Sequence, residues 1–308
     1  MQVGISIVSF QRPEPLKETL ESLEQLSPQP HRVCIFENAS PARQAFLSLS
    51  ELFPTMHWIF SEVNLGFAEG HHSAMQWLIE QDCDALLLLN PDLNLPSETL
   101  GCFEEVSNFL QNEQILGPLL LSRDASEKTG SPLIDSCGLR LDKFFRAMDV
   151  NQGMPLDSFG LDGLGKSIEV DGICGAALWV PVSLLPMKKD RLLFDSNYFA
   201  YFEDTELALF CKQQGLKMSL VPNLHFIHDR GGFGRLNQLT ESDWQQNPEA
   251  VRGVLLNRYR CWFQYFNWKD LPRFPGFLPY EIIRWLYIWF RKPYLRTLWK
   301  EMWRLRRF

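Results

Sequence analysis

Short apolar runs alternate with segments of helical periodicity over residues 3–121. Strand-like runs occupy 3–10, 32–36, 57–60, 85–89 and 115–121, and helical patterns occupy 13–25, 41–52, 68–81 and 97–111. Strands that alternate with helices of about ten to fifteen residues are typical of βαβ units and predict a parallel sheet. The run LLLL at 86–89 has no polar alternation, as expected of a strand covered on both faces.

The regular alternation is lost over residues 123–168, which are rich in Gly, Ser, Asp and Pro. We expect irregular connections there, with one short hairpin. Regular patterns return at 169–181, and a helix is predicted from about Thr205 with Gly215 just past its end. A strand is predicted at 219–224, with His225 and His228 following it.

Composition and charge refine this picture. The chain has 308 residues, is 45% hydrophobic and 22% charged, and is therefore typical of a folded globular protein. Its net charge of −7 is unevenly distributed, because the segment after residue 250 holds thirteen Lys or Arg against three acids. Six of the ten Trp lie in the same segment. The sequence thus predicts two surfaces with different partners, neither of them nucleic acid.

The seven cysteines are scattered singly, without a CxxC pair. This spacing favours neither a zinc site nor a disulfide framework and predicts a reduced, cytoplasmic protein. A strand that begins at Val3 leaves no room for a signal peptide. No apolar run reaches the roughly 20 residues that span a bilayer.

The residues that follow each strand are the first candidates for chemistry, because open parallel sheets bind ligands at the carboxyl ends of their strands. They are Ser9–Arg12, Glu37–Ser40, Asn64–Gly70 and Asn90–Asp92. No GxGxxG follows the first strand, and no GxxxxGK[ST] occurs, which disfavours a nicotinamide site and an ordinary P-loop.

Two of these loops have alternative interpretations. Asp92 can hold a hard divalent cation that bridges two phosphates, or Asn90-Pro91 can simply form a turn that ends the strand. The glycines of Asn64–Gly70 can admit a ligand, or they can permit a turn and a helix start.

A pair of adjacent carboxylates follows a group of aromatic residues in YFAYFEDTELALF at 198–210. Asp204 is expected at or beside the N-cap of the helix that follows, where it can accept backbone N–H groups. A helix N-terminus also favours the ionised carboxylate, so Asp204 in a partly apolar cleft can instead act as a general base. The spacing is compatible with both roles.

Six segments follow one another as VSFQRPEPLKETLESL, FENAS, NLGFAEG, LLLLNPDL, VDGICGAALWVP and FAYFEDTELALFCKQQGLKMSLVPNLHFIHDRGG. Together they resemble the family 2 inverting glycosyltransferases of GT-A fold, particularly the rhamnosyltransferase-like branch. The resemblance covers residues 3–232. It implies an α/β, Rossmann-like GT-A domain at 1–232, with a mostly parallel central sheet flanked by helices, and leaves 233–308 as a basic, Trp-rich helical extension.

The same resemblance implies a nucleotide-sugar donor above the first four strand ends. The residues that it places around the donor are Ser9, Phe10, Glu37, Asn64, Gly66 and Asn90. Glu37 stands where the family usually has Asp, and NPD replaces DxD, which leaves Asp92 as the only carboxylate of that segment.

For catalysis, the resemblance implies that Asp204, with Glu203 beside it, is the general base for an acceptor hydroxyl. Asp92 and His228 would hold Mg²⁺ or Mn²⁺ on the diphosphate. The expected activity is transfer of a sugar, rhamnose by analogy with the branch, to a cell-surface polysaccharide or lipid-linked glycan. A catalytically silent GT-A-like scaffold that binds a nucleotide-sugar at the membrane is the alternative.

The segment YLRTLWKEMWRLRRF at 294–308 places Trp and Leu on one helical face and Arg and Lys on another. A basic helix with a Trp-rich face suits an anionic membrane surface, although packing on the main domain or a dimer contact also explains it. We therefore expect a cytoplasmic protein at the inner face of the cell membrane, held peripherally by its C-terminal helices.

Overall fold

The first half of the main domain follows the predicted alternation. The elements are β1 (Val3–Ser9), α1 (Pro13–Glu24), β2 (Arg32–Glu37), α2 (Arg43–Leu52), β3 (His57–Phe60), α3 (Gly66–Glu80) and β4 (Ala85–Leu89). The computed structural model describes residues 1–26, 29–96, 106, 114–142, 144–160, 167–188, 191–230, 239–266, 269 and 274–305. The helix expected over 97–111 lies outside the described residues, apart from Val106.

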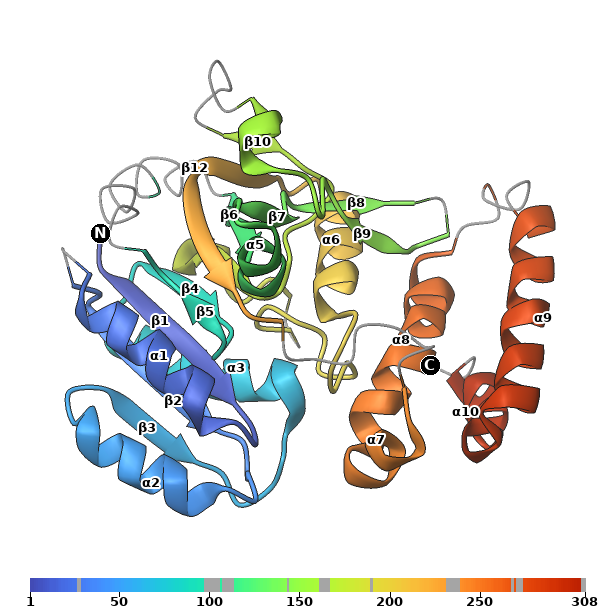
Figure 1. The fold of residues 1–308 in the computed structure, drawn as a ribbon, viewed down its shortest axis with the longest axis horizontal. Coiled ribbons are helices and arrows are strands. Elements are labelled where there is room, and N and C mark those ends of the chain that lie inside the picture. The colour runs from blue at the N-terminus through green and yellow to red at the C-terminus, as the bar shows by residue number, and fades with distance from the viewer. Residues whose placement is uncertain are drawn as a thin grey trace.

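A single large sheet joins the two halves of the domain (Figure 1). Its strand order is β10-β12-β6-β11-β4-β1-β2-β3, with β5 (Leu93–Asn94) and β7 (Leu133–Ser136) paired at the side. The first four strands are parallel, as predicted, and β6 (Ile115–Ser122) is parallel to β12 (Met218–His228). Strand β11 (Ala177–Pro181) is antiparallel to both of its neighbours, β4 and β6.

The leucine run in β4 is covered on both faces, which confirms its interpretation. Leu87 and Leu89 pack in a core with α1 and α2. Leu86 and Leu88 pack in a second core with α3 and with α6 (Glu203–Gln214). Alternate residues of one strand therefore hold helices on opposite faces of the sheet.

The region 123–168 is more ordered than its composition predicts. The expected hairpin is present as β8 (Leu139–Leu141) and β9 (Ala147–Asp149). The missed helix α5 (Arg123–Thr129) is short, and Ser122 caps it by accepting the Ala125 N–H at 3.3 Å. The remaining pieces are strand β7, the 3₁₀ helix η2 (Leu156–Phe159) and strand β10 (Ile168–Glu169). The 3₁₀ helix η3 (Val182–Leu184) follows β11.

The strand predicted at 219–224 is longer than expected. His225 and His228 lie inside β12, not beyond it, so the predicted end of the strand at 224 was wrong. The ladder with β6 shifts register between Val221 and His225 and then continues to His228. Such a shift is typical of a β-bulge, which interrupts the alternation of apolar residues without ending the strand. The hydrophobic pattern therefore breaks at this point, but the strand continues.

The C-terminal helices form a unit with its own core. They are α7 (Glu241–Gln246), α8 (Pro248–Tyr265), α9 (Phe274–Arg291), the 3₁₀ helix η5 (Pro293–Leu295) and α10 (Leu298–Arg304), and they lie to one side of the sheet (Figure 1). The single helix expected over 294–308 is thus interrupted. None of the helices in the described ranges is long and apolar enough to cross a membrane. The domain boundary at 232 stays a prediction, because 231–238 lie outside those ranges.

Candidate active site

The predicted donor residues of the first two strands meet at the carboxyl edge of the sheet. Ser9 and Glu37 are register partners at the ends of β1 and β2, and the Asn38 N–H donates to the Ser9 carbonyl at 3.0 Å. Phe10 follows Ser9 and is half-buried. Both Ser9 and Glu37 are fully buried.

Two buried oxygens at this edge have no hydrogen-bond partner among the described residues. They are the Ser9 hydroxyl and Glu37 Oε2. The other oxygen of Glu37 accepts the Ser40 N–H at 2.5 Å. Burial raises the pKa of Glu37, because desolvation penalises the ionised form. Buried polar atoms of this kind are suited to hydrogen bonds with a polar ligand.

Asn38 holds the turn at 64–66 against the end of β2. Its side-chain amide donates to the Gly66 carbonyl at 3.0 Å and accepts the Leu65 N–H at 2.7 Å. Asn64 stabilises the same turn by accepting the Gly66 N–H at 2.9 Å. Asn38 lies in the predicted loop Glu37–Ser40, but sequence reasoning gave it no role. An Asn directly after a strand is a recognisable turn signal.

Gly66 joins this turn to the loop at 198–202. Its φ is +80°, and a Cβ there would lie 2.3 Å from the Phe199 carbonyl oxygen. The next residue, Phe67, donates its N–H to the same oxygen at 2.7 Å. Gly66 is therefore required by backbone geometry and close packing, independently of any ligand.

The loop that follows Phe199 has a strained backbone immediately before α6. Tyr201 and Phe202 both have positive φ, at 66° and 72°. Bulky residues rarely adopt this conformation, and such strain is concentrated at functional sites. Phe202 is the N-cap of α6 and makes no side-chain capping bond, so Glu203 and Asp204 lie in the first turn.

Asp204 is held by two backbone N–H groups. Its carboxylate accepts Thr205 N–H at 2.6 Å and Gly175 N–H at 3.3 Å. Burial raises the pKa of Asp204, the two N–H groups oppose this shift, and the charge of Asp149 adds to it. Burial and the charge of Asp204 likewise raise the pKa of Glu203. Such a carboxylate has the restrained geometry and raised basicity of a general base.

A short path of contacts connects Asp204 to the metal-binding candidate. Gly175, which bonds Asp204, precedes Ala176, whose carbonyl accepts the Asn90 N–H at 2.8 Å. Asn90 lies two residues before Asp92. This proximity follows from the antiparallel pairing of β11 with β4, which brings the start of β11 to the end of β4.

Asp92 and His228, the two residues that the resemblance assigns to the metal, face each other. Asp92 Oδ1 lies 3.6 Å from His228 Nε2 and has no hydrogen-bond partner among the described residues. His228 Nδ1 bonds Asp135 at 2.8 Å, which orients the other ring nitrogen toward Asp92. Burial lowers the pKa of His228, but the carboxylates of Asp135 and Asp92 outweigh it and raise the pKa to about 9.

This donor set fits a divalent cation. A carboxylate oxygen and an imidazole nitrogen at this separation can bind one ion, and a carboxylate behind the histidine is the usual support of such a ligand. Within the described ranges no three His, Cys, Asp or Glu side chains cluster as a metal site. Asp92 and His228 would therefore give two ligands, and a bound diphosphate would have to give others.

Arg230 extends the charged cluster toward the catalytic candidate. It bonds Asp135 at 2.8 Å and Asp149 at 2.7 Å, and the charge of Asp149 acts on Asp204. Asp135 and Asp149 were missed by sequence reasoning. They lie on β7 and β9, within the segment whose pattern predicted irregular connections, and only the fold brings them to the site.

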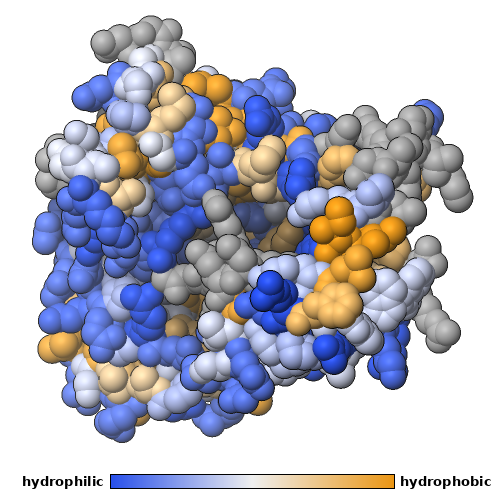
Figure 2. All heavy atoms as spheres, turned by 45° about the vertical axis from the view of Figure 1, so that its right-hand side comes forward, coloured by the Kyte–Doolittle hydropathy of each residue, from blue (hydrophilic) through white to orange (hydrophobic). Residues whose placement is uncertain are grey.

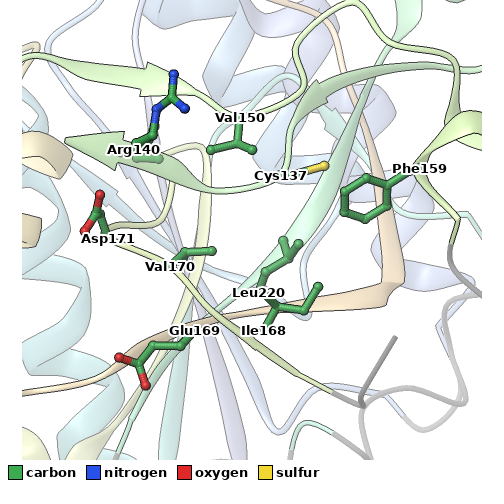
Figure 3. Close-up of a pocket in the computed structure, with 10 residues that line it drawn as sticks. Cys137, Arg140, Val150, Phe159, Ile168, Glu169, Val170, Asp171 and Leu220 are labelled. Atoms are coloured by element: carbon green, nitrogen blue, oxygen red, sulfur yellow. The ribbon is translucent and has the colours of Figure 1, made fainter. Parts of the chain in front are cut away.

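A hollow of about 540 Å³ lies beside the hairpin of β8 and β9 (Figure 3). Its wall includes the apolar residues Val150, Ile168, Val170 and Leu220. The carboxylates of Glu169 and Asp171 also line it. None of the predicted site residues lines it. We therefore place the candidate site at the strand ends.

Comparison with solved structures bears on the fold of the chain. The chain is similar to the crystal structure of GalNAc-T7 with UDP, GalNAc and Mn²⁺, at a TM-score of 0.55 and 14% identity over 90% of this chain and 54% of that chain. It thus spans about half the length of that protein. This chain has a GT-A fold. The predicted mixed α/β architecture, a central sheet flanked by helices, is confirmed.

The GT-A chain also resembles the crystal structure of S. aureus TarS 1–349, at a TM-score of 0.48 and 10% identity over 86% of this chain and 70% of that chain. Similarity at that level does not by itself establish a common fold. No family model and no curated protein matches the sequence.

Proposed function

We propose that this chain is an inverting glycosyltransferase that moves a sugar from a nucleotide-diphosphate donor to a hydroxyl of a cell-surface polysaccharide or lipid-linked glycan. The observation that carries the proposal is the contact path from Asp204 through Gly175 and Ala176 to Asn90. It brings a basic carboxylate to the same sheet edge as the predicted diphosphate site.

The donor lies over the ends of β1 to β4. Ser9 and Glu37 offer the unpaired oxygens described above to its base and ribose, and the half-buried ring of Phe10 lies beside them. The turn at Asn64 and Gly66 and the end of β4 at Asn90 complete this side. The GT-A fold supports this placement, as does the presence of UDP in the structure of GalNAc-T7.

Asp204 acts as the general base. It takes the proton of the acceptor hydroxyl while that oxygen forms a bond to the anomeric carbon, and the bond from that carbon to the diphosphate oxygen breaks on the opposite face. This geometry inverts the anomeric configuration. The backbone N–H groups of Gly175 and Thr205 fix the carboxylate. Burial and the charge of Asp149 raise its pKa, so that Asp204 can take up a proton.

Asp92 and His228 are the residues that would hold Mg²⁺ or Mn²⁺, and such an ion would neutralise charge on the departing diphosphate. Asp135 fixes the ring of His228 through its 2.8 Å hydrogen bond. Arg230 lies next to this pair through Asp135 and supplies a permanent positive charge.

Rhamnose is the first sugar to test, because the sequence resembles the rhamnosyltransferase-like branch of family 2. Donor hydrolysis and transfer should be screened over UDP-, GDP- and dTDP-sugars, with and without Mn²⁺. Donor binding by calorimetry without turnover of any donor would instead favour the silent scaffold.

The decisive variant is Asp204→Asn. We expect turnover to fall by about 10²- to 10⁴-fold with little change in donor affinity, because the base is lost while the donor site is intact. Since Asp204 must be ionised and its pKa is raised, wild-type activity should increase with pH through a midpoint above the usual aspartate range. Asp124→Asn, an exposed surface change, is the control. Full transfer by Asp204→Asn would return this residue to a structural role in the first turn of α6.

A further inference from the structure

Helix α9 is apolar on both sides, but only one side is covered. Trp285 and Ile288 are buried against α8 and α10. The opposite side carries large apolar side chains that are exposed, among them Ile283 at 67% and Phe290 at 72%. A helix that is apolar all round is normally buried on all sides, so the outer side of α9 lacks a partner in the described chain.

We call the exposed apolar side chains of α9 and α10 the outer apolar face. It consists of Tyr280, Ile282, Ile283, Leu286, Tyr287, Trp289 and Phe290 of α9 with Trp299 and Trp303 of α10. Trp299 of α10 packs edge-on against Trp285 on the covered side of α9 at 5.0 Å and against Trp303 at 5.9 Å, so that α10 lies beside α9. Figure 2 shows hydrophobic residues gathered on this side of the molecule. An apolar surface of this extent marks an interaction site.

Positive charges lie beside the outer apolar face. Arg296 sits over the ring of Trp289 at 5.1 Å, and Arg291, Lys300 and Arg304 are exposed on the same two helices and their connection. The two acidic residues described from 279 onward do not balance them. Glu281 is buried in a pair with Arg258, and Glu301 pairs with Arg252 of α8.

We propose that the outer apolar face docks on the surface of an anionic phospholipid membrane. Aromatic and aliphatic side chains suit the boundary between headgroups and acyl chains, and the adjacent cations suit acidic headgroups. A second copy of this chain is a poorer partner, because a two-fold contact would bring the same unbalanced cations together. The docking accounts for the expected location at the inner face of the cell membrane.

The face is firmly connected to the candidate active site through α8. Trp285 of α9 donates to the hydroxyl of Tyr259 on α8 at 2.9 Å, and Asn257 on α8 donates to the carbonyls of Ala200 and Tyr201. Membrane docking would fix the candidate active site relative to the bilayer and favour a lipid-linked acceptor. This consequence for the acceptor rests on the proposed function.

Flotation of the full chain with vesicles tests the docking without any assay of activity. We expect binding to vesicles that contain phosphatidylglycerol and much weaker binding to phosphatidylcholine alone. The double variant Ile283→Ser/Phe290→Ser should lower the partition coefficient by about tenfold or more, because two exposed apolar groups no longer enter the interface. Leu52→Ser/Val63→Ser, at 63% and 59% exposure on the main domain, is the matched control and should not change it.

The charge contribution is tested separately. Arg291→Gln and Lys300→Gln should each weaken binding by about fivefold at low salt, whereas Lys17→Gln and Lys128→Gln on exposed sites of the main domain should not. Failure of the wild-type chain to float overturns the proposal, as does equal flotation of all variants. A concentration-dependent dimer that Ile283→Ser/Phe290→Ser dissociates, seen by light scattering without vesicle binding, would assign the face to a second copy.

Discussion

Single residues decide how the strand ends are joined to the loop that precedes α6. Gly66 approaches the Phe199 carbonyl more closely than any side chain permits, and Asn38 fixes the turn from the other side. Two residues after Phe199, the strained pair Tyr201 and Phe202 begins, and it leads directly into the Glu203-Asp204 turn. The strained backbone therefore lies immediately before Asp204, the carboxylate whose orientation the proposed function depends on.

The substitution Gly66→Ala should destabilise the protein by about 3 kcal/mol. It combines an unfavourable φ with a Cβ that meets backbone at 2.3 Å. Gly130→Ala is the matched control, because its φ of +71° is similar but nothing lies within 4 Å of the added Cβ. Chemical denaturation should therefore show a loss of only about 1 kcal/mol in the free energy of unfolding for Gly130→Ala. Equal losses for the two variants would contradict the close contact with Phe199.

At the scale of elements, α6 is anchored by a buried ion pair. Glu206 is fully buried and meets Arg191 at 2.6 Å, and Arg191 lies over the ring of Phe210 at 4.1 Å. Tyr265 of α8 also donates its hydroxyl to Glu206. Asp204 belongs to the same helix, so these contacts fix the direction in which its first turn points.

Removal of one partner, in Arg191→Met, should lower the free energy of unfolding by about 3 to 5 kcal/mol, because Glu206 is left buried without its cation. Lys212→Met, on α6 like Glu206, breaks only an exposed pair with Asp171 at 3.4 Å. It should lower the free energy of unfolding by less than about 0.5 kcal/mol. The double variant Arg191→Met/Glu206→Leu should recover part of the loss. A double variant less stable than Arg191→Met would show that the pair is not the main anchor.

At the scale of the whole molecule, the C-terminal helices contact a loop of the GT-A domain. Asn257 of α8 is buried and donates to the carbonyls of Ala200 at 3.0 Å and Tyr201 at 2.7 Å. Gly253, one turn earlier, leaves no room for a Cβ against the Ala200 carbonyl. The helical unit therefore holds the loop that precedes Asp204, in addition to carrying the outer apolar face.

The variant Asn257→Ala should reduce turnover by about tenfold or more and leave donor affinity unchanged, because a shift of the loop displaces Asp204 but not the strand ends. Loss of two hydrogen bonds to buried carbonyls should also cost about 2 kcal/mol of stability. Steady-state kinetics with the best donor of the screen checks the first part. Gln246→Ala, which removes an exposed bond to Ser242, is the control. Wild-type turnover in Asn257→Ala would show that α8 does not position the base.

Much of the fold was predictable because it depends on local periodicity. The four parallel strands, the three helices between them and the residues at their ends follow from which positions are apolar and which residues stop a run. Ser9 and Glu37 were found in this way, and their register pairing confirms that they lie together. The same pattern selected Asp92 and Asp204 but left two roles open for each of them. The resemblance to a family favoured the metal and general-base roles and assigned His228 to the metal.

The sequence by itself determined the alternating α/β pattern, the double-sided burial of β4 and the concentration of cations and Trp after residue 250. Only the tertiary structure decided that β11 runs antiparallel beside β4, which brings Gly175 and Asp204 to Asn90, and that Asp135 and Asp149 join the site. It also decided which side of α9 is covered. The physical reason is that periodicity records how one segment is buried, whereas strand direction and contacts between distant segments depend on what packs against it.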